Sequence, residues 1–167
     1  PALTVVGNQT ANEGATLSLT NIGTFTDPGF DNALNVGGET EESFTYTIDW
    51  GDGTADSTGS ATVDQMGSAG VLTSGSFDGS HVYADNGTYT VTVTVEDDDT
   101  GSDVKTFTVT VGNVAPTLTV VGNQTVAEGA ELSLTNIGTF TDPGFDNPLN
   151  AGGETQEFFT YTIAWGD

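Results

Sequence analysis

The chain has 167 residues, of which 24 are Asp or Glu and only one is Lys or Arg, so its formal net charge is −23. This charge excludes a basic patch for nucleic acid or an anionic membrane, and it makes cations the available counter-charge. With no Cys and a single His, disulfides, thiolate catalysis and multi-histidine or Cys-type metal sites are excluded as well. No run approaches the roughly 18 apolar residues of a membrane span, so we expect no direct membrane insertion.

Apolar and polar residues alternate with a period of two along much of the chain, which is typical of half-buried strands. In chain order, strands are expected at residues 3–6, 17–19, 43–50, 70–83, 88–95 and 104–111, separated by Gly, Asn and Asp clusters. The residues expected to point inward are Leu17, Leu19, Phe44, Tyr46, Ile48, Trp50, Tyr89, Val91, Val93, Val95, Phe107, Val109 and Val111. One apolar face per strand and no crossover helix predict about seven strands per repeat in an all-β, immunoglobulin-like antiparallel β-sandwich.

A second copy of the same sequence begins at Pro116. Residues 116–167 are identical to residues 1–52 at 43 of 52 positions, with a constant offset of 115. We therefore expect tandem repeats of about 115 residues, the size of one domain. Residues 1–115 are predicted to form a complete sandwich, residues 111–116 a stiff linker, and residues 116–167 the N-terminal part of the next, truncated repeat. The second copy stops inside a motif that continues in the first, so we expect either one stretch of a longer polymer or missing strands that come from a neighbouring copy.

Two acidic loops are candidates for cation binding, because Ca²⁺ takes six to eight oxygen ligands and needs several carboxylates in one place. The first loop, residues 26–32, carries Asp27 and Asp31 on either side of a Pro-Gly turn. The second, residues 96–103, includes the consecutive carboxylates Asp97 to Asp99, which repel one another unless a cation lies nearby. Two alternatives stay open: a solvated acidic turn without an ion, and a diffuse acidic surface adapted to high salt.

Three residues that could suggest catalysis have structural interpretations. Asp52 lies between two glycines, where an Asp side chain accepts hydrogen bonds from the N–H groups of a tight turn. His81 has no identifiable nucleophile as a partner, and Trp50 at a strand end is expected to anchor the core. The sequence therefore predicts a protein that is not an enzyme, and it predicts a salt bridge for Lys105.

Three motifs occur in an order that resembles the polycystic kidney disease (PKD) domain. They are Trp50-Gly51-Asp52-Gly53, then His81-Val82-Tyr83, then the strand from Asn86 to Val95 with the acidic turn at Asp97–Asp99. The chain differs from the family pattern by about 20 extra residues around positions 64–79. Some PKD-like modules bind calcium, and this resemblance implies the following ligands: Asp27, Asp31, Asp97 and Asp99 in the first copy, and Asn113, Asp142 and Asp146 for the second.

The resemblance and the tandem identity favour a structural function. We expect a non-catalytic repeat of an extracellular filament, stalk or adhesin shaft at the cell surface, rigidified by Ca²⁺. Its partners would be neighbouring copies of the same repeat, within or between chains, because repeated units stack through the same joint. The alternative is an accessory module of a secreted multidomain protein that binds polysaccharide or protein, for which an exposed row of aromatic residues would be required.

Overall fold

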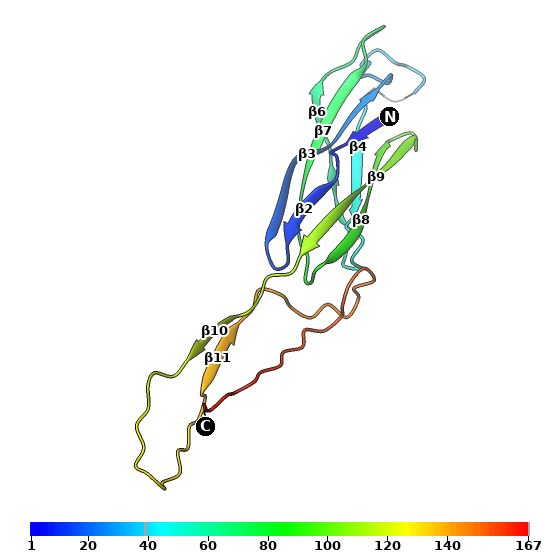
Figure 1. The fold of residues 1–167 in the computed structure, drawn as a ribbon. Coiled ribbons are helices and arrows are strands. Elements are labelled where there is room, and N and C mark those ends of the chain that lie inside the picture. Colours follow the sequence, from blue (N-terminus) through cyan, green and yellow to red (C-terminus); the bar gives the residue numbers. More distant parts are fainter. Residues whose placement is uncertain (39, 167) are drawn as a thin grey trace.

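The computed structural model describes residues 1–38 and 40–166, and the secondary-structure elements in this part of the chain are all β-strands (Figure 1). The strands are β1 Ala2–Val5, β2 Gln9–Asn12, β3 Thr16–Asp27, β4 Phe44–Asp49, β5 Ser57–Ser60, β6 Thr62–Gln65, β7 Thr73–Val82, β8 Gly87–Asp97, β9 Ser102–Gly112, β10 Thr117–Val120 and β11 Gly138–Thr141. Accordingly, no described residue belongs to a helix that could cross a bilayer.

Two sheets built from β1 to β9 make a sandwich, as the sequence predicted. One sheet has the order β1-β3-β7-β6 and the other the order β2-β9-β8-β4-β5. The long β8–β9 hairpin keeps one register from Gly87↔Val111 to Glu96↔Ser102, because its alternating Val and Thr residues fit only one of the two faces. The extra segment around positions 64–79 overlaps β6 and β7, and of these two strands β6 lies at the edge of the first sheet.

The core lies between the sheets and contains the residues that alternation had selected, except that Leu19 and Tyr46 are only partly buried against it. The inward-facing side chains of β8, from Tyr89 to Val95, are at most 1% exposed. Aromatic rings join the two layers: Phe25 of β3 lies 4.6 Å from Phe44 of β4, and Tyr46 of β4 stacks 4.4 Å from Phe77 of β7. Burial of this apolar face is the main force that holds the sandwich together.

Two connections differ from a simple antiparallel meander. β2 pairs with β9 in parallel, from Gln9↔Val109 to Asn12↔Gly112, so the chain changes sheets between β1 and β2. The Asn86-Gly87 pair, which on its own is a tight-hairpin signal, instead joins β7 of one sheet to β8 of the other. Both features bring the ends of distant strands to the same end of the sandwich.

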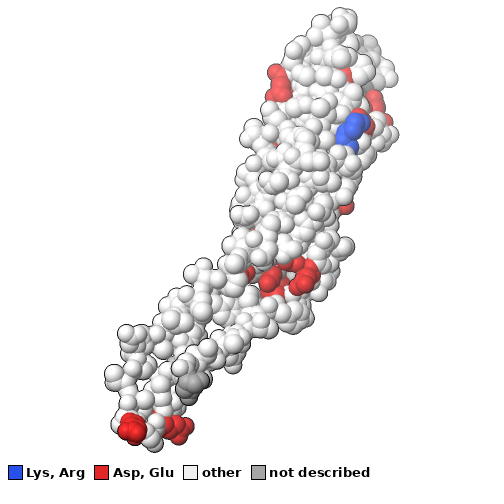
Figure 2. Space-filling view, in the orientation of Figure 1, with Lys and Arg blue, Asp and Glu red and all other residues white. Residues whose placement is uncertain are grey.

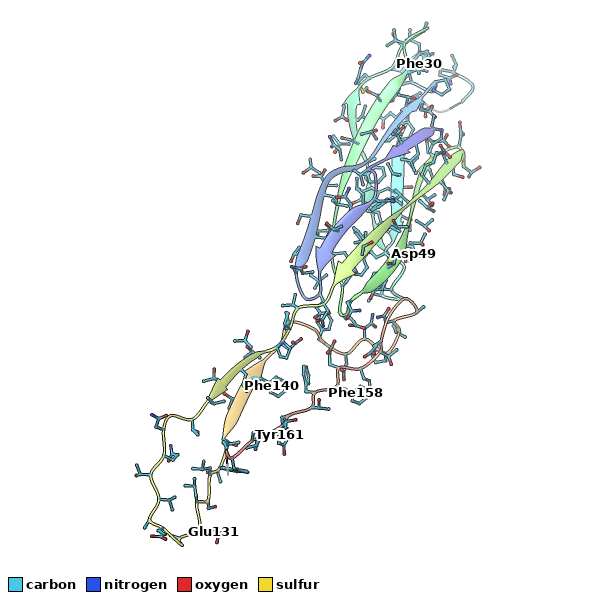
Figure 3. The ribbon with its side chains drawn as sticks, in the orientation of Figure 1. Phe30, Asp49, Glu131, Phe140, Phe158 and Tyr161 are labelled. Atoms are coloured by element: carbon cyan, nitrogen blue, oxygen red, sulfur yellow. The ribbon has the colours of Figure 1, made fainter. Side chains whose placement is uncertain are left out.

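The second copy begins to repeat the first but stays open. The β10–β11 pair, from Thr117↔Thr141 to Val120↔Gly138, has the register of β1–β3 shifted by 115 residues. Side chains that correspond to core positions are exposed here: Leu118 is 66%, Phe140 51% and Trp165 62% exposed. Figure 3 shows Phe140, Phe158 and Tyr161 spaced along this open segment. In the first copy, β7, β8 and β9 cover these positions.

Candidate metal sites at the two ends of the sandwich

We call the end of the sandwich that carries residues 26–38, 40–42 and 97–103 the head, and the end that carries Glu13, Asp52 and Asp85 the tail. The second copy leaves from the tail (Figure 1). Acidic side chains gather where the sandwich meets the second copy, whereas the Lys side chain lies toward the head (Figure 2).

At the head, the structure brings Asp27 and Asp97 to one centre. Oδ2 of Asp27 lies 2.6 Å from the Pro1 ammonium nitrogen, and Oδ2 of Asp97 lies 3.9 Å from the same atom. The other oxygen of each carboxylate, Oδ1, accepts a hydrogen bond within the loop to which the residue belongs. Asp27 Oδ1 accepts from the N–H of Gly29 at 2.7 Å, and Asp97 Oδ1 accepts from the N–H of Gly101 at 2.6 Å. Two loops far apart in the sequence therefore bring their carboxylates together at the head.

Asp31 and Asp99 lie at the head but outside this pair. Asp31 is exposed, and its Oδ1 accepts the N–H of Glu42 at 2.7 Å, which closes the loop between them. Asp99 is exposed as well. Partial burial raises the pKa of the nearby Glu42, and the negative charges of Asp98, Asp27, Asp97 and Asp99 raise it further. The head thus carries several acidic side chains, and the single Lys of the chain, Lys105, pairs with Asp103 there.

In the second copy, Asp142 and Asp146 repeat the local geometry of Asp27 and Asp31. Asp142 accepts the N–H of Gly144 at 2.9 Å, and Asp146 accepts that of Glu157 at 2.9 Å. Asn113 points elsewhere: its Nδ2 donates to Oε1 of Glu13 at 3.2 Å. Asn113 is thereby joined to a residue that the sequence had not singled out.

At the tail, the structure assembles three carboxylates that sequence reasoning missed. Glu13, Asp85 and Glu157 each offer an oxygen within 4.8 Å of the others. Glu13 follows β2, Asp85 lies between β7 and β8, and Glu157 belongs to the second copy. No spacing in the sequence connects them, because the parallel β2–β9 pair and the docking of the second copy create the proximity. Burial, followed by the charges of Asp85 and Glu13, raises the pKa of Glu157.

The second copy docks on the tail through specific hydrogen bonds. Backbone N–H groups of Phe145 and Glu154 donate to Ala84 O at 3.1 Å and to Asp85 Oδ2 at 2.7 Å. Two buried side-chain amides complete the contact. Nδ2 of Asn147 donates to Asp52 O at 3.1 Å, and Nδ2 of Asn150 donates to the Tyr89 hydroxyl at 3.2 Å.

Two glycines make this approach possible. Gly14 and Gly53 have φ angles of 67° and 78°, and a Cβ on either would overlap the carbonyl oxygen of Pro143 or Leu149. Both positions therefore need a residue that accepts a positive φ and has no side chain. We call this contact between the tail and residues 143–157 the joint.

Asp52 and His81 have the structural roles predicted for them. Asp52 is 1% exposed, and its Oδ1 accepts the N–H and hydroxyl of Thr54 at 3.1 and 2.6 Å. Its Oδ2 lies 2.8 Å from Nε2 of His81, whose ring stacks on Trp50. Burial raises the pKa of Asp52, but the hydrogen bonds from Thr54 and His81 outweigh it, so the pKa of this carboxyl is lowered. Lys105 forms the expected salt bridge, 2.6 Å from Asp103.

The chain is similar in structure to a known protein domain. No protein-family model matches the sequence, and no curated protein matches it. Among solved structures, the chain is similar to the PKD domain of an M14-like peptidase from Thermoplasmatales archaeon SCGC AB-540-F20. The two are 26% identical, the match covers 66% of this chain and 92% of the other, and the TM-score is 0.40.

Proposed function

We propose that this chain is a non-catalytic stretch of an extracellular filament, stalk or adhesin shaft, in which PKD-like sandwiches follow one another head to tail. The observation that carries the proposal is the joint, where the buried amides of Asn147 and Asn150 bond to the tail of the preceding sandwich. Side-chain amides are satisfied in a buried contact only when both surfaces are shaped for it. A loosely tethered second copy would not need such a contact.

The first copy carries the same docking loop at its opposite end. Residues 28–38 are the counterparts of residues 143–153, and Phe30 marks their place at the head (Figure 3). In this loop Leu34 is 86% and Val36 102% exposed. Because head and tail are different surfaces, each docking leaves one free head and one free tail, which produces an open linear array.

We further propose that residues 116–167 are the N-terminal part of a second sandwich whose domain spans the same 115-residue period. The exposed Leu118, Phe140 and Trp165 are counterparts of Leu3, Phe25 and Trp50, each at most 4% exposed in the first copy. An apolar set of this kind is stable when further strands cover it. Those strands would come from the rest of the repeat or from a neighbouring chain by strand exchange.

Calcium is the cation that we propose for the head, held by Asp27 and Asp97, with Asp31 and Asp99 adding charge nearby. The placement of these two carboxylates supports this, because Oδ2 of Asp27 and Oδ2 of Asp97 lie 2.6 and 3.9 Å from one point, the Pro1 nitrogen. The counterpart of this nitrogen in the second copy, at Pro116, is an uncharged tertiary amide. In the second copy, Asn113, Asp142 and Asp146 are the residues that we propose to hold the ion, since Asp142 and Asp146 repeat the local geometry of Asp27 and Asp31.

The structural role is favoured over binding of polysaccharide. A platform for sugar stacking needs several exposed aromatic rings on one surface. Within the described part of residues 1–112, Phe30 is the one aromatic side chain more than a third exposed, at 37%. The aromatic residues of the sandwich are used instead for its core.

A matched pair of substitutions tests the head-to-tail joint. Asn147 and its counterpart Asn32 make the same local turn, each accepting an N–H two residues later at 3.1 Å, but only Asn147 also donates to Asp52 O. Asn147→Asp keeps the side-chain oxygen that accepts the N–H of Leu149 and removes the amide that donates to Asp52 O, so we expect the free energy of docking to weaken by about 1–3 kcal/mol. Hydrogen exchange of the Phe145 and Glu154 amides measures this loss of docking.

In the native chain both amides should be protected, and Asn147→Asp should accelerate their exchange. Asn32→Asp should leave their exchange unchanged. Unprotected amides in the native chain would mean that the second copy is only tethered, and the array proposal would then fail.

A further inference from the structure

The three carboxylates at the joint form a compact group. Glu13 is 1% and Asp85 5% exposed, Glu157 is partly buried, and one oxygen from each lies within 4.8 Å of the other two. None of these residues is among the ligands that the PKD resemblance implied. A solvated acidic surface lets carboxylates move apart, whereas here the fold holds two of them out of water.

An independent feature of Glu13 points to a ligand. Its Oε1 accepts the N–H of Val114 at 2.6 Å and Nδ2 of Asn113 at 3.2 Å. Its Oε2 is fully buried and has no hydrogen-bond partner, the one such side-chain atom among the described residues. An ionised oxygen in this position is unfavourable unless a positive charge reaches it.

The protein's own positive groups do not reach the joint. Within the described residues, the two side chains that can carry a positive charge pair elsewhere, His81 with Asp52 and Lys105 with Asp103. None of these ion pairs involves the three joint carboxylates. The compensating charge therefore has to come from solution.

The geometry points to a calcium ion held by Glu13, Asp85 and Glu157 at the joint between consecutive copies. Ca²⁺ binds oxygen at about 2.3–2.6 Å, so two oxygens on one ion lie up to about 5 Å apart, in keeping with the observed group. All three ligands are hard carboxylate oxygens, without the nitrogen or sulfur that zinc and copper prefer. Water and backbone carbonyl groups can complete the six to eight ligands of calcium.

The ligands are divided between two copies, and this division gives the ion a mechanical role. Glu13 and Asp85 belong to the tail of one sandwich, and Glu157 belongs to the head segment of the next. Glu42, the counterpart of Glu157, lies at the free head, so each joint of an array would rebuild the site. This inference rests on the proposed head-to-tail array. Because calcium binds the docked joint better than the open one, it must favour docking by the same factor.

The test uses the chain of residues 1–167 and two measurements, calcium binding by titration calorimetry and hydrogen exchange of the Phe145 and Glu154 amides. CaCl₂, MgCl₂ and NaCl are compared at equal ionic strength. We expect Ca²⁺ to slow exchange of both amides tenfold or more beyond the effect of NaCl, with Mg²⁺ weaker. Glu157→Gln, and separately Glu13→Gln, should remove this calcium-dependent slowing and one calorimetric site.

Glu42→Gln is the matched control, because Glu42 has the same local sequence at the free head and should leave the joint amides as sensitive to calcium as before. Glu157 lies in a loop outside the sandwich, so the sandwich of Glu157→Gln should melt at an unchanged temperature. Calcium binding and amide protection that are the same in Glu13→Gln, Glu157→Gln and the native chain would overturn the site. If the amides are protected but insensitive to calcium, the site fails and the array remains. If they are unprotected in every salt, the array proposal fails with it.

Discussion

Asp52 shows how a motif residue that invites a catalytic interpretation serves the fold. Its carboxylate is buried beneath His81 and accepts two hydrogen bonds from Thr54, while the backbone oxygen of the same residue receives Asn147 from the second copy. One residue thus closes a turn, holds the ring that stacks on Trp50 and forms part of the joint. The surrounding glycines allow this because Gly53 accepts a positive φ and a close neighbour.

We predict that Asp52→Asn destabilises the first sandwich by about 1–3 kcal/mol near neutral pH, since hydrogen bonds to a buried carboxylate are lost or weakened. The lowered pKa of Asp52 sets the pH dependence. The extra stability of the native chain over Asp52→Asn is fully present at a pH above 3.8, the ordinary pKa of an Asp side chain. It is lost as the pH falls through the lower pKa that Asp52 has in the folded state. Urea denaturation at several pH values measures this difference.

Asp56→Asn is a suitable control for that series, because Asp56 is exposed on the same loop. Its effect should stay within about 0.5 kcal/mol at every pH. A difference between the native chain and Asp52→Asn that does not shrink in acid would contradict the role assigned to the ionised carboxylate.

At the scale of elements, the two copies let the same sequence be compared in a closed and an open setting. Phe25 of β3 is 3% exposed and contacts Phe44, whereas its counterpart Phe140 of β11 is 51% exposed and contacts Phe159. The ring pairs have the same centroid distance of 4.6 Å. What differs is the layer of strands above them, which only the first copy has.

We therefore predict that Phe25→Ala costs the sandwich about 3–5 kcal/mol, the range for deleting a buried ring. Phe140→Ala should change the same unfolding transition by less than about 0.5 kcal/mol, because the ring is largely in water already. Chemical denaturation followed by the fluorescence of Trp50 provides the measurement, with Trp165 replaced by Phe in both variants. Equal losses of unfolding free energy in Phe25→Ala and Phe140→Ala would mean that the second copy contributes to the stability of the first sandwich beyond the contacts at the joint.

At the scale of the whole molecule, the net charge of −23 dominates. With one Lys for 24 acidic side chains, self-repulsion opposes the compact state at low ionic strength. Salt shortens the range of this repulsion, to about 10 Å at 0.1 M. Any binding of calcium at the head or the joint adds to this general effect and does not replace it.

We predict that the Tm of the chain rises by several degrees between low and high NaCl, since screening reduces the repulsion in the folded state. Differential scanning calorimetry in NaCl, with the calcium chelator EGTA present, measures the general effect. CaCl₂ at the same ionic strength should raise the Tm further, and Asp27→Ala should reduce that extra increase. If NaCl and CaCl₂ stabilise equally, the acidic surface is diffuse, as expected for adaptation to high salt.

Alternation and turn residues predicted most of the sandwich because burial of one strand face is a local, periodic property. The inward positions of β4, β8 and β9 are confirmed by burial, with Tyr46 only partly buried. The parallel pairing of β2 with β9 and the sheet change at Asn86-Gly87 were not predictable in this way. They depend on which sheet each strand joins, and this is decided by packing of the whole domain.

The candidate site residues also fall into two groups, those that a local pattern predicted and those that only the fold brings together. Loop composition identified Asp27 and Asp97, whose carboxylates the fold brings together at the head. It also indicated Asp31 and Asp146, which accept hydrogen bonds within their own loops. Glu13, Asp85 and Glu157 carry no signal in the sequence, since each is a single acidic residue in a different segment. Their proximity requires a folded tail and a docked second copy.

By itself, the sequence determined that this protein is an all-β chain with an internal repeat, a strongly acidic surface and no material for thiol or multi-histidine chemistry. These properties follow from composition and from periodicities that are short compared with a domain. The tertiary structure alone decided which carboxylates meet and how one copy sits on the next. Contacts between residues such as Glu13 and Glu157 depend on strand pairing and docking over long separations, and no local pattern records them.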